Sequence, residues 1–154
     1  MRTKIRGVLF LLAAALVAPA AHAADAGVAT SAGQLPDGFA DTLSELARRG
    51  AAVQAMSVSN NGDWVVVSDR GVAASPGLPA PLRAAIDDAV RRGQPVEAVA
   101  QQGGRWTVVA GGQVSGDLPP DVRQQLLSSV SARRPVAAVA LAPGSPDGWA
   151  VAAG

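Results

Sequence analysis

Residues 78–110 read LPAPLRAAIDDAVRRGQPVEAVAQQGGRWTVVA, and this stretch decides the fold. A Leu-Pro pair opens it and an amphipathic segment follows. Two short apolar runs then flank a Gly-Gly turn, and Trp106 stands near the head of the second run. The same order occurs twice more, opened by Leu35-Pro36 and Leu118-Pro119, at spacings of 43 and 40 residues. Self-similarity at a fixed spacing of this size is the signature of a repeat protein.

Each unit is predicted to fold as a helix, a strand, a turn and a second strand. Proline suits the first turn of a helix, and Leu82, Ile86 and Val90 then recur at helical spacing, which gives one apolar face. Gly and Asn between the runs are typical of tight turns. The expected first strands are Val53–Val58, Val96–Gln101 and Val136–Leu141, and the expected second strands are Trp64–Ser68, Trp106–Ala110 and Trp149–Ala153.

The predicted fold class is α+β, with three tandem helix-strand-strand repeats at 35–77, 78–117 and 118–154. A hairpin reverses the chain within a unit and the helix returns it, so the last strand of one unit is expected to run parallel to the first strand of the next. This gives a six-stranded mixed sheet with three helices on one face. The sequence leaves open whether the sheet is an open layer or curls toward pseudo-threefold symmetry.

The helix ends carry a further expectation. Gly50 and Gly93 stand where a left-handed residue would end the first two helices. The third helix has no such glycine and is followed by Arg133-Arg134-Pro135. Its exit is therefore predicted to differ from the other two.

Residues 1–23 have the form of a secretory signal peptide. Basic residues precede an apolar core from Val8 to Val17, and Ala21-His22-Ala23 is a small-x-small cleavage site. Residues 24–34 are small and polar, which is typical of a flexible lead-in. The expected localisation is periplasmic or secreted, and the absence of cysteine means that the domain relies on its core alone.

Removal of the leader changes the charge of the chain. Three of the 13 basic residues and none of the 12 acidic ones are lost, so the net charge changes from +1 to −2. A mildly acidic chain has no long-range attraction for phosphate backbones or anionic lipid. We therefore expect no nucleic-acid partner and no membrane association after cleavage.

Most catalytic chemistry is excluded by what residues 24–154 lack. They contain no cysteine, histidine or lysine, which removes common zinc sites, Ser-His-Asp triads, thiol nucleophiles and P-loops. Carboxylate chemistry survives, and a carboxylate-based hydrolase of envelope or extracellular polymers is the alternative function. The adjacent Asp87 and Asp88 point in different directions on a helix, and Asn60–Asp63 fits a hairpin turn better than a calcium loop. No catalytic residue, metal or cofactor is expected.

Two sets of residues remain as candidates for binding. The three tryptophans are either core residues or an aromatic platform, since each begins a strand at an equivalent point. The three arginine pairs either complement the helix dipoles at the C-termini or gather at one end of the molecule to bind an anion or an acidic protein. These residues are Trp64, Trp106, Trp149, Arg48, Arg49, Arg91, Arg92, Arg133 and Arg134.

The function that follows from the sequence is exported, non-catalytic binding. The expected partner is a protein or another component of the cell envelope. The sequence leaves the oligomeric state open.

Overall fold

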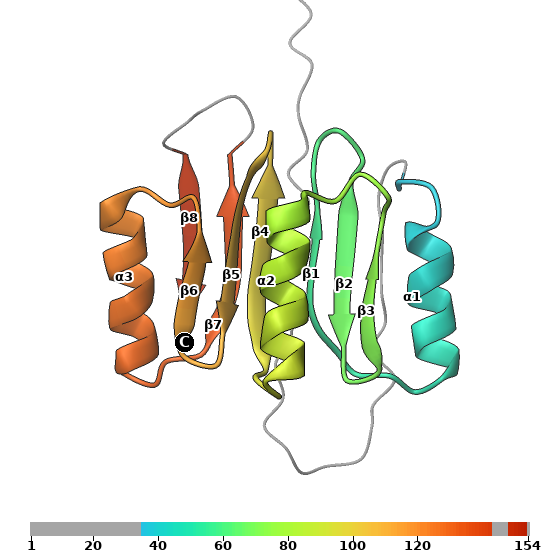
Figure 1. The fold of residues 1–154 in the computed structure, drawn as a ribbon, viewed down its shortest axis with the longest axis horizontal. Coiled ribbons are helices and arrows are strands. Elements are labelled where there is room, and N and C mark those ends of the chain that lie inside the picture. The colour runs from blue at the N-terminus through green and yellow to red at the C-terminus, as the bar shows by residue number, and fades with distance from the viewer. Residues whose placement is uncertain (1–34, 143–147, 154) are drawn as a thin grey trace, which may run out of the picture.

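The computed structural model describes residues 35–142 and 148–153 and gives an α+β fold (Figure 1). The predicted signal peptide and lead-in, residues 1–34, lie outside the described residues. The helices are α1 (Phe39–Arg48), α2 (Ala80–Arg91) and α3 (Pro120–Ser131). The strands are β1 (Val53–Val58), β2 (Trp64–Ser68), β3 (Gly71–Ala74), β4 (Val96–Gln102), β5 (Arg105–Ala110), β6 (Gln113–Gly116), β7 (Val136–Leu141) and β8 (Trp149–Ala153).

The eight described strands form three small antiparallel sheets. Sheet A has the order β1-β2-β3, sheet B has β4-β5-β6, and sheet C has β7-β8. The predicted six-stranded mixed sheet is therefore wrong. Two strands that the sequence analysis missed, β3 and β6, pair with the free edges of β2 and β5. With these edges occupied, β2 and β5 cannot pair in parallel with the first strand of the next unit, as the prediction required.

The first strands of the three sheets lie next to one another. β4 lies beside β1 on one side and beside β7 on the other, without a backbone ladder between them. Side chains bridge the first of these contacts, because the amide N–H of Gln101 donates to Oγ of Ser57 at 3.2 Å and that of Asn60 donates to Oε1 of Gln102 at 3.1 Å. The sheets are thus joined at their first strands.

The helices pack against successive sheets rather than on one face of a single sheet. Side chains alternate along β2, so Trp64 and Val66 face α1, while Val65 and Val67 face α2. α2 also packs on sheet B, where Ile86 belongs to the same apolar cluster as residues of β4 and β5. α3 is in contact with both sheet B and sheet C in the same way. The prediction of three helices on one face of a single sheet is wrong, because the sheets are separate: α1 packs on sheet A, whereas α2 and α3 each pack on two successive sheets.

All three helices end in the same way. The backbone N–H of Gly93 donates to the carbonyl of Val90 and that of Gln94 donates to the carbonyl of Ala89, which is a Schellman cap. Arg133 and the residue after it make the corresponding bonds at the end of α3, and Arg133 has a φ of 54°. The predicted difference in the third exit is wrong, since the arginine itself adopts the left-handed conformation.

Among residues 35–142 and 148–153, no helix has the length and apolar character needed to cross a membrane.

Candidate functional site

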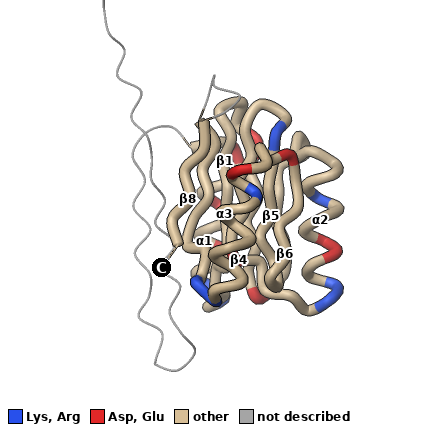
Figure 2. Tube along the Cα trace, turned by 90° about the vertical axis from the view of Figure 1, so that its left-hand side faces the viewer, with Lys and Arg blue, Asp and Glu red and all other residues tan. Residues whose placement is uncertain are grey.

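The C-termini of α1, α2 and α3 point to the same end of the molecule, which is the lower end in Figure 1. Each helix is followed or ended there by an arginine pair, and basic residues are seen at this end in Figure 2. We call this surface the arginine end. Its residues are Arg48, Arg49, Arg91, Arg92, Arg133 and Arg134.

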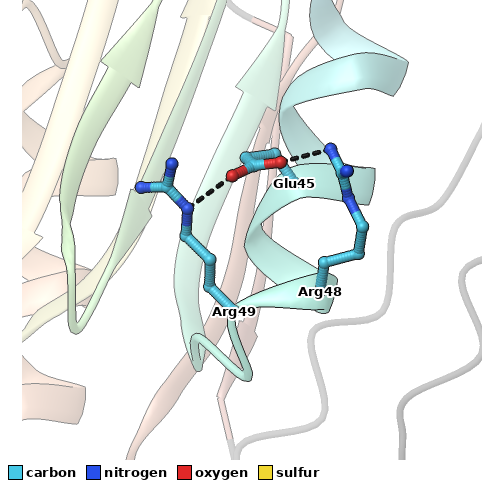
Figure 3. Close-up of polar contacts among 3 residues, drawn as sticks. All are labelled: Glu45, Arg48 and Arg49. Atoms are coloured by element: carbon cyan, nitrogen blue, oxygen red, sulfur yellow. Dashed lines mark hydrogen bonds and ion pairs between the residues drawn. The ribbon is translucent and has the colours of Figure 1, made fainter.

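The first arginine pair shares one carboxylate. Nη2 of Arg48 donates to Oε2 of Glu45, and Nε of Arg49 donates to Oε1 (Figure 3). The hydrogen bond from Arg49, followed by the charge of Arg48, lowers the pKa of Glu45 below its usual value. The two arginine side chains remain 74% and 68% exposed. Ion pairs this exposed contribute little to folding, so the guanidinium groups stay open to a ligand and carry a net positive charge.

The second pair is arranged similarly around Asp88. Arg91 lies 3.5 Å from Oδ1 of Asp88, and Arg92 bonds to Oδ2 of the same residue. The adjacent Asp87 turns instead toward Arg83, at 3.8 Å. The two neighbouring carboxylates therefore engage different arginines and do not converge on a common proton or metal.

The third pair has no carboxylate partner within residues 35–142 and 148–153. Arg133 and Arg134 are exposed, and neither has an ion pair or side-chain hydrogen bond within the described part of the chain. Two guanidinium groups on neighbouring residues thus stand in solvent without neutralisation. Of the three pairs, this one is the least neutralised by described carboxylates.

Figure 2 shows acidic residues at both ends of the molecule, and at the upper end basic residues lie among them. Asp41 and Asp121 lie in the first turns of α1 and α3, where the helix dipole favours negative charge. The carboxylates at the helix N-termini and the arginines at the C-termini thus offset the partial charges of the helix ends.

The three tryptophans belong to three different apolar clusters. Trp64 is only 6% exposed, meets Phe39 edge to face at 5.6 Å, and donates its Nε1–H to the carbonyl of Asp37 at 3.1 Å. Trp106 and Trp149 are half-buried against the clusters of α2 and α3. The structure brings the arginine pairs to a common end but distributes the indoles among separate clusters.

Arg105 lies over the ring of Trp149, with its guanidinium carbon 5.8 Å from the ring centroid. Nε1 of Trp149 is buried without a hydrogen-bond partner among the described residues. The cation–π contact covers the ring from the side of sheet B.

A buried polar cluster near the β1–β2 turn was not anticipated from the sequence. Gln101 is 5% exposed and donates its Nε2–H to the carbonyl of Asp63 at 3.1 Å. The same carbonyl closes the turn by accepting the N–H of Ser59 at 2.8 Å, so the hairpin prediction for Asn60–Asp63 is confirmed. The predicted strand ended at Gln101 and left out Gln102, and residue type alone does not show that both glutamines are buried. Its polar groups bond to one another and join sheets A and B.

A hollow between α2 and sheet B encloses about 10 Å³, which is close to the least space that a single water molecule needs. Within residues 35–142 and 148–153, no group of three His, Cys, Asp or Glu side chains is placed to hold a metal ion. Comparisons with protein-family models, with curated proteins and with solved structures yield no match.

Proposed function

We propose that the protein is an exported, non-catalytic interaction protein that binds an acidic protein surface in the cell envelope through the arginine end. The observation that carries the proposal is the exposed Arg133-Arg134 pair, which has no carboxylate partner among the described residues and stands at the same end as the other two pairs. The periplasmic or secreted location rests on the signal peptide predicted for residues 1–23.

The chemistry of arginine supports an anionic partner. A guanidinium group presents a planar fork of N–H donors that matches a carboxylate in a bidentate geometry, and it keeps its charge at every physiological pH. Among the described residues, the six arginines of this end have Glu45 and Asp88 as their ion-pair partners. An excess of positive charge therefore remains for a ligand, although the chain without its leader has a net charge of −2.

We also infer that the three helix-sheet units are copies of one module. Three matched features support this inference. Each first strand has an irregularity at the same point of its pairing, each helix closes with the same two backbone bonds, and each second strand begins with or next to tryptophan. The irregularities fall between Val53 and Ala55, between Val96 and Ala98, and between Val136 and Ala138. Copies arranged side by side would repeat an arginine pair at regular intervals along one end.

The non-catalytic part of the proposal is supported by the state of the carboxylates. Asp87, Asp88 and Glu45 are paired with arginines, and Asp63 accepts hydrogen bonds from Asn61 and Ser75. A glycosidase needs two carboxyl groups flanking one bond, with one of them free to move a proton. Turnover of a glycan or ester that disappears on replacing a single aspartate would overturn the non-catalytic assignment.

A binding experiment with a fluorescent decaglutamate peptide tests the proposed ligand class. Fluorescence anisotropy would be measured at about 10 mM and about 150 mM salt, between which the Debye length falls from about 30 Å to about 8 Å. We expect binding at low salt, weaker binding at high salt, and a loss of affinity of about tenfold in the double variant R133Q/R134Q and in R91Q/R92Q.

Arg83→Gln is the matched control, because Arg83 lies on α2 outside the arginine end and is ion-paired with Asp87. It should bind decaglutamate as the parent chain does. Equal affinity of the parent chain and both double variants, or no binding at low salt, would contradict the proposal.

A further inference from the structure

Two internal interfaces of the molecule are built in the same way. The face of sheet A formed by Ala55, Val65 and Val67 is covered by α2 and by residues of sheet B. The corresponding face of sheet B, which includes Ala98 and Val109, is covered by α3 and by sheet C. In both cases the first strand of the covering unit lies beside the first strand of the covered one, β4 beside β1 and β7 beside β4.

Sheet C carries the same kind of face, but no described residue covers it. Ala138 pairs with Ala152 as Ala98 pairs with Val109 in sheet B. Ala140 pairs with Ala150 as Ala100 pairs with Thr107. Ala140, Ala150 and Ala152 are exposed and Ala138 is half-buried. We call these four alanines the tail face.

The first unit has the complementary deficiency. Val53 begins β1 and is 42% exposed, whereas Val96 and Val136 hold the same place in β4 and β7 and are 2% and 1% exposed. Leu43 of α1 is half-buried, whereas Ile86 holds the matching place in α2 and is 0% exposed. We call Leu43, Leu46, Val53 and Met56 the head face. These residues of α1 and β1 correspond to the residues with which α2 and β4 contact sheet A.

We propose that the head face of one copy of this chain packs on the tail face of a second copy. The occupant is a second copy because the molecule already contains this interface twice, between sheets A and B and between sheets B and C. The second internal interface shows that a tail face rich in alanine suffices, because Ala98 and Ala100 line it and are 4% and 3% exposed. Small side chains let a helix approach a sheet closely, so Leu43 and Leu46 would find room above the alanines.

The association would be heterologous. The head face lies on the first unit and the tail face on the last, so each copy offers one of each and the contact does not close on itself as a twofold dimer does. Growth in one direction would continue the internal stack and would place successive arginine ends along the same side. The inference concerns a different surface from the proposed anion site, and a monomeric chain could still bind decaglutamate.

Sedimentation velocity tests the proposal, with a charge placed on each face in turn. Ala150→Arg blocks the tail face and Val53→Arg blocks the head face. An unpaired arginine at an apolar contact should weaken association by about tenfold or more. We expect the sedimentation coefficient of the parent chain to rise with concentration and that of each variant to stay constant. The matched controls are Ala84→Arg and Val90→Arg, at exposed positions of α2, and they should associate as the parent chain does.

Mixing the two variants gives the decisive result, once circular dichroism has shown that each variant is folded as the parent chain is. A150R retains a working head face and V53R retains a working tail face, so an equimolar mixture should form a heterodimer that grows no further. A parent chain that remains monomeric at every concentration overturns the proposal. A mixture that stays monomeric, or variants that associate as the parent chain does, overturns it as well.

Discussion

Arg133 has the same left-handed backbone conformation as Gly93, with a φ of 54° compared with 66°. Both residues follow a helix, and both donate their N–H to a carbonyl three residues back, at 2.9 and 3.0 Å. Glycine adopts this conformation without steric cost, whereas an L side chain places its Cβ close to backbone atoms. The third unit therefore keeps the geometry of the second at the expense of some backbone strain.

Replacing Arg133 by glycine is expected to raise the free energy of unfolding by about 1 kcal/mol, because the strain is removed. Urea denaturation measures the change. Arg134→Gly is the control, since Arg134 has no positive φ and a glycine there only adds freedom to the unfolded chain. A loss of stability in R133G would contradict the assignment of strain to this residue.

Gln101→Leu should lower the free energy of unfolding by about 1–2 kcal/mol. The substitution removes the donor to the carbonyl of Asp63 from a side chain that is 5% exposed. Thermal or chemical denaturation gives the value, with the exposed Gln113→Leu as a control for the added apolar group. If both variants are equally stable, this bond does not help to hold sheets A and B together.

Gly116→Ala is expected to destabilise the fold by about 2–4 kcal/mol. A methyl group on Gly116 would collide with the carbonyl oxygen of Trp106, and the φ of 123° is unfavourable for any L side chain. Gly62→Ala shares a positive φ, 87°, but meets nothing within 4 Å, so it should cost only about 1 kcal/mol. Similar losses in the two variants would show that the close approach of β6 to β5 has little effect.

The stability contribution of Glu45 should depend on pH in a defined direction. Its pKa is lowered in the folded state by Arg49 and Arg48, so the contribution is present above the unfolded pKa of about 4.3 and is lost as the pH falls through the folded pKa. The difference in urea midpoint between the parent chain and Glu45→Gln should therefore shrink on acidification. High salt should reduce it at neutral pH as well, because all three side chains are solvent-exposed or partly so. A difference that grows at low pH would contradict the assignment.

Much of the local structure could be predicted from the sequence. The Leu-Pro openings and the helical spacing of Leu82 and Ile86 gave α2 its correct place, and the expected first strands match β1 and β7 at both ends. The tryptophan-headed runs match β2 and β8 in the same way. These elements were predictable because propensity, turn residues and apolar spacing agree in each of them.

Two features could not be predicted, and each has a physical reason. β3 and β6 have four residues each and begin with Gly71 and Gln113, so neither has the run of β-branched residues that indicates a strand. Their pairing with β2 and β5 nevertheless determines that the sheets are separate. The left-handed conformation of Arg133 was missed because arginine rarely adopts it. The two backbone hydrogen bonds of the cap outweigh the steric cost of this conformation.

The arginine end was anticipated only as one of two possibilities. The sequence places each pair near a helix C-terminus, but the common direction of the three helices depends on how the units pack. The carboxylate partners of the first two pairs, in contrast, follow from the sequence within one helical turn, since Glu45 and Asp88 lie three or four residues before their arginines. Among the described residues Arg134 has no acidic partner, because Val130 and Ser131 stand four and three residues before it, where the other pairs have a carboxylate.

A heteronuclear NMR titration with decaglutamate tests the central claim most directly, because it locates the binding surface residue by residue. We predict that the amide and side-chain Nε–H signals of Arg133 and Arg134 shift most, followed by those of Arg91 and Arg92, while the indole N–H of Trp64 stays in place. Shifts concentrated on the three indoles or at the N-termini of the helices, or no shifts at low salt, would contradict the assignment of function to the arginine end.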